Sequence, residues 1–129
     1  MTDPIADLLT RIRNIVARGK KTSYAPYSKI KEEILRVLKE EGFIKGYKVL
    51  EAEGKKELKI NLKYVDGKSM IHELKRISKP GVRWYISYKD IPVIKRGLGI
   101  TILTTPNGVI TGKQAKKDKV GGEFICEIW

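Results

Sequence analysis

The feature that most constrains the fold is a change of hydrophobic periodicity at Asp66-Gly67. Before this point, two segments carry apolar residues at intervals of three and four, the spacing of one helix face. After it, apolar and polar residues alternate in short runs separated by glycine and proline, as in short strands. The change predicts an α+β protein of two domains: an N-terminal α/β domain over residues 1–65, and a mostly-β domain with short helices over residues 66–129.

The first half of the N-terminal domain is expected to contain a helix and an edge strand. Asp3 is a candidate N-cap and Pro4 suits the first helical position, and an apolar stripe follows until Gly19. Residues 22–27 are predicted to be an edge strand, because Pro26 cannot donate a hydrogen bond within a sheet.

A second helix and a β-hairpin complete this domain. The helix is expected to begin after Ser28 as N-cap and to close at Gly42. Residues 47–51 and 58–64 are predicted to pair through a turn at 53–56. The exposed face of the helix is expected to carry charges of alternating sign: Lys31, Glu32, Glu33, Arg36, Lys39 and Glu40.

The C-terminal domain is expected to consist mainly of short strands. These are predicted at residues 69–77, 82–88, 99–104, 109–110 and 123–129, with short helical segments at 90–97 and 111–117. Within the second strand, Trp84, Ile86 and Tyr88 lie on one side, so we expect Tyr88 to complete the core beside Trp84.

The charge of the chain favours a polyanion partner. The 129 residues include 27 Lys+Arg and 15 Asp+Glu, a formal net charge of +12, and the excess is spread over both halves. With 41% hydrophobic residues, the chain has enough apolar material for a core, which excludes a disordered protein. The sequence has no apolar signal region and no segment long enough to span a membrane, so we expect a cytoplasmic protein without a membrane partner.

No motif for catalysis, a metal or a cofactor is present in the sequence. Gly97-Leu98-Gly99 lacks the third glycine of a dinucleotide fingerprint and precedes a strand. His72 and Cys126 lie on different predicted strands and are too few for a zinc site. We interpret His72 as an ordinary strand residue and Cys126 as a packed core thiol. The sequence therefore predicts a protein that is not an enzyme and takes no cofactor.

The segment from Gly99 onward combines groups suited to nucleic acid. A predicted strand brings Thr104 and Thr105 to a turn at Asn107-Gly108, and a short helical stretch presents lysines. Gly121-Gly122-Glu123 then offers backbone that a ligand could approach, beside an acid. Hydroxyls and backbone amides bond sugars, phosphates and base edges, while lysines add charge without reading sequence.

This segment closely resembles the signature of the bacterial small-subunit ribosomal protein S8 family. That signature has a glycine, two aliphatics, a hydroxyl residue and threonine, then glycine, two aliphatics, and an alanine followed by a basic residue. The matching residues here are Gly99, Ile102, Leu103, Thr104, Thr105, Gly108, Val109, Ile110, Ala115 and Lys116. Other segments are also similar to that family: the first seven residues, residues 11–14, residues 75–81 and the C-terminal segment 121–129. The resemblance therefore covers essentially the whole chain.

The resemblance implies a structural constituent of the small ribosomal subunit that is a primary binder of 16S ribosomal RNA. Members dock on a central-domain stem, helix twenty-one, and promote assembly of the 30S subunit. In many bacteria they also repress translation by binding an imitation of this stem in their operon mRNA. The implied partners are the central domain of 16S rRNA, the ribosomal proteins S5 and S12, and that mRNA, with a free protein that is monomeric. The implied fold has two interfaced domains, of which the C-terminal one is the RNA-binding domain.

Carried over by position, the resemblance implies RNA contacts in the C-terminal domain. They are Thr104, Thr105, Asn107, Gly108, Lys113, Lys116, Gly121, Gly122 and Glu123, and we add Arg83 and Tyr85 as candidates for an exposed base or ribose. Pro106 departs from the family's common Ser-Thr-Ser form, and it has neither the third hydroxyl nor an amide N–H. Replacing Thr105 by alanine is expected to weaken binding to the stem while leaving the stability of the fold nearly unchanged.

A second, more electrostatic contact is expected in the N-terminal domain. Helix N-termini present free amide groups to phosphate, and basic residues lie near both predicted helix starts. The candidates are Thr2, Asp3, Arg11, Asn14, Lys29, Lys31 and Lys55, although capping explains Asp3 equally well and solvated lysines are common.

Two other functions fit parts of the same pattern. A nucleic-acid chaperone without sequence preference would need the same positive charge. A small enzyme that holds a phosphorylated metabolite at the hydroxyl turn is the other, but no activating base accompanies Thr104 in the sequence.

Overall fold

The computed structural model describes residues 3–129, which form two compact units. The N-terminal unit is Pro4–His72, and the C-terminal unit is Glu73–Trp129 together with Asp3. The division therefore falls later along the chain than the boundary expected at Asp66. Thr2, a predicted RNA contact, lies outside the described residues.

The helices of the N-terminal unit begin and end where their local sequence signals lie. Helix α1 (Pro4–Ala17) starts at the proline, and Gly19 follows it with φ of +67°. Helix α2 (Lys29–Glu40) starts after Ser28, whose hydroxyl accepts a hydrogen bond from the Lys31 amide at 3.3 Å. Gly42, with φ of +81°, then turns the chain into the sheet.

The sheet of the N-terminal unit has the strand order β1-β3-β2, all antiparallel. Strand β1 (Thr22–Pro26) lies at the edge, as its proline requires, and β2 (Ile44–Ala52) and β3 (Lys55–Leu62) form the expected hairpin, longer than predicted. A small ladder of β4 (Tyr64–Val65) and β5 (Lys68–Ser69) follows.

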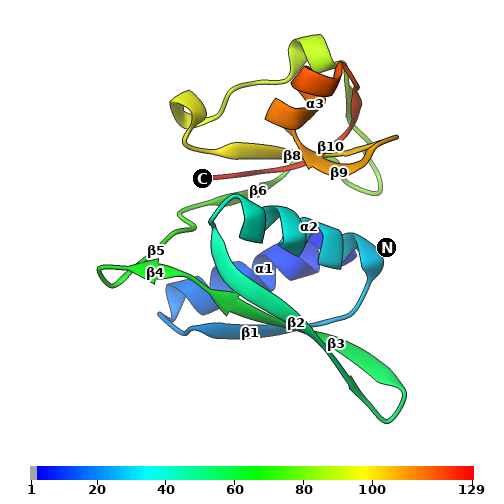
Figure 1. The fold of residues 1–129 in the computed structure, drawn as a ribbon. Helices are drawn as coiled ribbons and strands as arrows, with labels where there is room; N and C mark the ends of the chain where they lie inside the picture. Colours follow the sequence, from blue (N-terminus) through cyan, green and yellow to red (C-terminus); the bar gives the residue numbers. More distant parts are fainter. Residues whose placement is uncertain (1–2) are drawn as a thin grey trace. The chain divides into compact units, whose positions relative to one another are not determined.

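The core of the N-terminal unit lies between the sheet and its two helices (Figure 1). Alternate residues of β3, from Leu58 to Leu62, are buried, as are the apolar stripes of α1 and α2. This alternation buries one face of the sheet and leaves the other to solvent, which is the common arrangement for antiparallel sheets.

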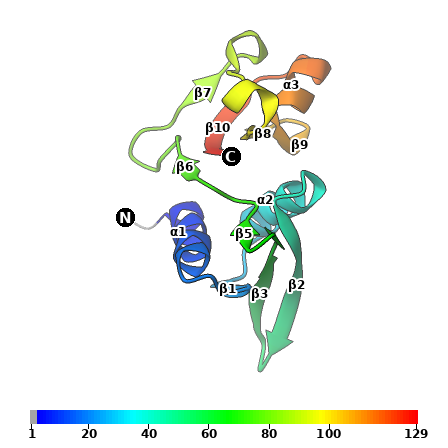
Figure 2. The same cartoon turned by 90° about the vertical axis from the view of Figure 1, so that its left-hand side faces the viewer.

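The C-terminal unit is built around strand β10 (Gly122–Ile128), which pairs with three others. On one side lies β8 (Ile100–Thr105), which continues to β9 (Gly108–Thr111). Two short strands, β6 (Leu74–Arg76) and β7 (Tyr85–Ile86), pair with opposite ends of β10. Figure 2 shows β6 (green) and β7 (yellow-green) next to β10 (red), with which both pair.

A short helix covers part of this second sheet. Helix α3 (Gly112–Asp118) follows Thr111, whose hydroxyl accepts from the Gln114 amide at 3.2 Å, as the sequence predicts. Its Ala115 packs with Leu103 and Ile91, and Tyr88 packs against this cluster. Tyr88 therefore packs against the core, as expected, but it is only partly buried and its neighbours are these residues rather than Trp84.

Two strand predictions in the C-terminal unit are wrong in extent. The strands predicted at 69–77 and 82–88 shrink to β6 and β7, and 3₁₀ turns η1 (Tyr88–Asp90) and η2 (Lys95–Gly97) follow. Trp84 is 56% exposed, so its predicted core position is also wrong. His72 lies between strands rather than in one, whereas Cys126 is fully buried, as expected.

The predicted exposed face of α2 contains one error with a clear physical cause. Lys31 is only 4% exposed, and its ammonium group donates to the Pro26 carbonyl at 2.9 Å. Burial lowers the pKa of Lys31, and the positive charge of Arg11 acts in the same direction while Asp7 opposes it. The alternating charge pattern could not reveal this, because β1 supplies the carbonyl.

None of the helices within residues 3–129 combines the length and the apolar character that crossing a bilayer requires.

Candidate nucleic-acid interface

Three paired strands of the C-terminal unit bring three of the predicted RNA contacts into one row. Glu123 on β10 pairs with Tyr85 on β7 and with Thr104 on β8, and Thr104 pairs in turn with Val109 on β9. Paired residues of antiparallel strands point to the same face of a sheet. The structure thus places Tyr85, Glu123 and Thr104 side by side, although they are far apart in sequence.

Thr105 organises the turn between β8 and β9. Its hydroxyl donates to the Gly108 carbonyl at 2.9 Å and accepts from the Asn107 amide at 3.1 Å. Gly108 has φ of +100°, a region open mainly to glycine, and Asn107 is exposed. Both of these hydrogen bonds stabilise the turn, and Thr105 is only 8% exposed.

The Thr104 hydroxyl is enclosed by protein and has no hydrogen-bond partner among the described residues. The hydroxyl of Thr104 is therefore turned into the protein, although the residue as a whole is partly exposed. An unpaired buried hydroxyl costs free energy, so this position is one where the fold gives up stability.

Pro106 occupies the exposed tip of the same turn. The turn needs no amide N–H from this position, because the Thr105 hydroxyl accepts from the Asn107 amide instead. The proline is compatible with the turn geometry but leaves the tip without the third hydroxyl of the family's common form.

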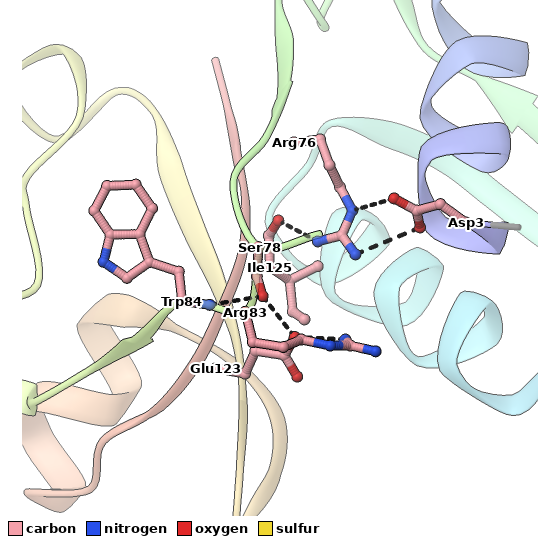
Figure 3. A network of polar contacts seen from close by, with 7 residues as sticks. All are labelled: Asp3, Arg76, Ser78, Arg83, Trp84, Glu123 and Ile125. Atoms are coloured by element: carbon pink, nitrogen blue, oxygen red, sulfur yellow. Dashed lines mark hydrogen bonds and ion pairs between the residues drawn. The ribbon is translucent and has the colours of Figure 1, made fainter. Parts of the chain in front are cut away.

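Glu123 is held in place by two donors from the loop before β7 (Figure 3). The Ser78 hydroxyl donates to its Oε2 at 2.6 Å, and Arg83 Nη1 donates to the same oxygen at 2.8 Å. Ser78 also accepts from the Trp84 amide at 3.0 Å, which ties this loop to the acid. Within the described chain, Oε1 of Glu123 accepts no hydrogen bond, so one carboxylate oxygen is fixed and unused.

The environment keeps Glu123 ionised. Burial of its side chain, which is 16% exposed, would raise its pKa, but the hydrogen bonds from Ser78 and Arg83 and the charges of Arg83 and Arg76 outweigh this and lower the pKa. The same bond raises the pKa of the Arg83 guanidinium. A fixed, charged acceptor on a basic protein can select N–H and O–H donors and repels bare phosphate.

Gly121 and Gly122 permit close approach between strands. A Cβ on Gly122 would lie 2.2 Å from the Thr104 carbonyl oxygen, and one on Gly121 would lie 2.5 Å from the Ile86 carbonyl oxygen. Backbone atoms of Thr104 and Ile86 fill the space next to Gly122 and Gly121. Close packing between strands therefore explains why both positions are glycine.

Exposed aromatic and basic side chains also lie just before β7, on β7 and on α3. Tyr85 is 69% exposed, and the ring of Trp84 points away from the Ser78–Glu123 network (Figure 3). Lys113 and Lys117 of α3 are exposed, and Lys116 is half-buried. Sequence reasoning missed Trp84 as a surface residue, because alternation alone placed it beside Tyr88 in the core.

Asp3 is engaged in an ion pair within the C-terminal unit. Its carboxylate accepts from Arg76 at 3.2 Å, and Arg76 also donates to the Ile125 carbonyl at 2.8 Å (Figure 3). Arg76 is therefore a link between Asp3 and the backbone of β10, a role that the sequence did not indicate.

The candidates in the N-terminal unit differ in whether their side chains are free. Arg11 donates to Asp7 at 2.8 Å and to the Tyr24 carbonyl at 3.1 Å, and the ammonium group of Lys31 is used internally. Asn14 and Lys29 are exposed, as is Lys55 near the tip of the hairpin. The structure does not gather these candidates at one point, because they lie on α1, α2 and the start of β3.

This arrangement is suited to binding rather than to covalent chemistry. The 105–108 turn, the carboxylate of Glu123 and the exposed ring of Tyr85 lie on neighbouring paired strands, and exposed lysines lie on α3. Cys126 is not a nucleophile, since burial raises the pKa of its thiol to about 12.

Comparison with known proteins gives a consistent result. A family model described as "Ribosomal protein S8" matches residues 3–129. The small ribosomal subunit protein uS8 of Thermus aquaticus is 50% identical over 137 residues, which cover 100% of this chain and 99% of that protein. Proteins of the same name from Koribacter versatilis (strain Ellin345) and Rhizobium etli (strain CIAT 652) are 53% and 51% identical, covering 99% and 100% of this chain and 97% and 98% of theirs.

Proposed function

This chain belongs to the ribosomal protein S8 family, and we propose that it is a structural constituent of the small ribosomal subunit that binds 16S ribosomal RNA. Relatives that are 50% and 53% identical over nearly their full length are named small ribosomal subunit protein uS8. These names support a location in the cytoplasmic ribosome. Membership of a family of ribosomal proteins also agrees with the expectation that the chain is not an enzyme.

The proposed RNA target is an irregular stem of the 16S central domain, helix twenty-one, whose binding promotes 30S assembly. The carboxylate of Glu123 is the observation that carries this proposal. A freely mobile acid would oppose a polyanion, whereas one held by Ser78 and Arg83 with Oε1 unused can accept from a 2′-hydroxyl or a displaced base. The neighbouring Asn107, Tyr85 and Trp84 are exposed and offer an amide and two stacking surfaces.

The proposed binding mode separates shape recognition from charge. Glu123 and the 105–108 turn would discriminate the stem, and the lysines of α3 would strengthen binding to any RNA. A message that imitates the stem would use the same surface, which is how translational repression would arise. The ribosomal proteins S5 and S12 remain proposed neighbours.

Chemical footprinting on 16S RNA with two matched variants tests this function. Glu123→Gln removes the charge and keeps the shape, and Glu127→Gln makes the same change on the same strand at a side chain that lacks the two donors. We expect the parent and Glu127→Gln to protect one stem in the presence of competitor RNA. Glu123→Gln should bind that stem more weakly by about 1–3 kcal/mol.

Two results would count against this function. Protection of many unrelated duplexes by the parent would favour the nonspecific chaperone. Equal binding by both variants would remove Glu123 from the recognition surface.

A further inference from the structure

A concave surface lies in the N-terminal unit, where β2 begins and β3 ends. It is an open groove of about 1080 Å³, which we call the lysine groove. Its charged lining consists of Lys21, Lys39, Lys45, Lys48 and Lys63, and no acidic residue lines it. None of these lysines belongs to the RNA contacts predicted from the sequence.

A β-bulge shapes the lysine groove. Ile44 pairs with Leu62 and Gly46 pairs with Asn61, so Lys45 is an extra residue on β2 opposite an uninterrupted β3. A Cβ built on Gly46 would meet no atom within 4 Å, and the φ of Gly46 is not positive. Packing and backbone conformation therefore do not require this glycine, which leaves the groove open at the bulge.

The five lysines are unused by the fold. All are exposed, and within residues 3–129 none of them forms an ion pair or a side-chain hydrogen bond. Other cations of this unit do have partners, as Lys31 has the Pro26 carbonyl and Lys56 the ring of Tyr27. The last turn of α2 favours a cation at Lys39, but this accounts for one lysine of the five. Five unpaired cations around one groove repel one another unless an anion joins them.

The lining favours a nucleic-acid strand over an acidic protein segment. Protein segments bind through apolar anchors that enter pockets. The aliphatic side chains here, Ile44 and Leu62, are only 2% and 4% exposed and offer no such pocket. The remaining lining includes the Asn61 amide and the rings of Tyr47 and Tyr64, and Tyr64 is fixed by donating its hydroxyl to the Lys20 carbonyl. Basic grooves with aromatic rings are typical of sites for single-stranded nucleic acid.

We propose that the lysine groove binds the phosphate backbone of a single-stranded RNA segment, independently of its sequence. This inference rests on the proposed RNA-binding function and adds a second site to it, on the other unit from Glu123. The site would hold flanking RNA while the C-terminal unit engages the stem.

Fluorescence anisotropy with a labelled oligouridylate of about 12 nucleotides tests the lysine groove directly. The double variant Lys45→Gln/Lys48→Gln is compared with Lys20→Gln/Lys68→Gln, which removes equal charge at lysines of the same unit outside the groove. Each phosphate contact to a single strand contributes about 0.7 to the slope of log affinity against log salt. We expect the groove variant to lower the slope by about 1.4, and the control to lower it by less than half as much.

A second pair of variants separates the effect of filling the lysine groove with a side chain from the effect of adding a negative charge to it. Gly46→Glu and Gly46→Gln add side chains of nearly equal size where there is open space. We expect Gly46→Glu to weaken oligouridylate binding several-fold more than Gly46→Gln, with both variants folded by circular dichroism. Both should retain the preference for the 16S stem over a regular duplex, whereas Glu123→Gln should lose stem affinity and keep the salt slope.

Two results would overturn the proposal. Equal slopes for the groove and control pairs would mean that the lysines act only through total charge. Displacement of the oligouridylate by polyglutamate at the same charge concentration would mean that the groove does not distinguish RNA from an acidic protein. Loss of the stem preference in the parent would contradict the proposed function instead, so the two failures are distinguishable.

Discussion

The hydroxyl of Thr105 makes two hydrogen bonds inside one turn, and Lys31 directs its charge into the protein rather than toward solvent. Both residue types are common ligands for nucleic acid, and sequence alone cannot tell a ligand from a structural group. The acceptors that show a structural role are the backbone carbonyls of Gly108 and Pro26. The pattern of side chains in the sequence does not indicate hydrogen bonds to backbone carbonyls. Ser28 and Thr111 were predictable as caps because their partners lie three residues away.

Thr105→Ala is expected to destabilise the protein, contrary to the sequence-based expectation of nearly unchanged stability. Loss of the hydroxyl leaves the Asn107 amide and the Gly108 carbonyl without this partner, at a cost of about 1–2 kcal/mol. Thr105→Ser keeps the hydroxyl and should lose less than half as much. Urea unfolding of the three proteins measures this, and an unchanged midpoint for Thr105→Ala would show that the turn does not need the hydroxyl.

Lys29 and Lys31 provide a matched pair on one helix. Lys31→Ala should lower the free energy of unfolding by about 1–3 kcal/mol, because it removes the buried aliphatic part of the side chain and the hydrogen bond to the Pro26 carbonyl. Lys29→Ala should change stability by less than about 0.5 kcal/mol, since Lys29 is exposed. Thermal unfolding checks both values. Similar losses at the two positions would contradict the internal role of Lys31.

At the scale of elements, β10 connects most of the C-terminal unit, and its first residues provide both a close packing contact and the carboxylate proposed to bind RNA. Short apolar runs bounded by glycine and proline predicted β8, β9 and β10, although burial along these strands does not alternate strictly. Alternation overestimated the strands around Trp84, because the loop there is held by Ser78 and Glu123 rather than by a continuous ladder. Side-chain bonds between distant residues cannot be derived from local alternation.

Gly122→Ala tests the close contact between β10 and β8. The added methyl would meet the Thr104 carbonyl at 2.2 Å, so the strands must separate, and we expect a loss of about 1–3 kcal/mol. Gly81→Ala is the control, since its Cβ would meet no atom within 4 Å. Urea unfolding distinguishes them, and equal stability of the two variants would refute the packing role.

The Glu123 network predicts a defined pH dependence. Because the folded protein lowers the pKa of Glu123, its stabilising effect is present above the ordinary value of 4.5 and is lost as pH falls through the lowered folded value. The difference in unfolding free energy between the parent and Glu123→Gln should therefore be constant near neutral pH and shrink in acid. A difference that grows on acidification would contradict this network.

At the scale of the whole molecule, a net charge of +12 indicates a polyanion partner but does not locate it. The resemblance to S8 proteins supplied the candidate contacts in the C-terminal unit, and the structure separates exposed candidates such as Asn107 and Tyr85 from the buried hydroxyl of Thr104. The lysine groove was not predictable from the sequence. Its lysines lie in the last turn of α2, on the bulged strand β2 and next to the ends of β1 and β3, and only folding brings these segments together.

The central claim is that a fixed surface of uncharged groups and one held carboxylate recognises a shaped RNA, with lysines adding only strength. The most direct measurement is the ratio of Kd values for a regular duplex and for the irregular 16S stem of equal length, at several salt concentrations. We expect the stem to bind at least about 100-fold more tightly, with a ratio that hardly changes with salt because charge contributes to both complexes alike. Equal affinities, or a preference that disappears as salt rises, would contradict the account.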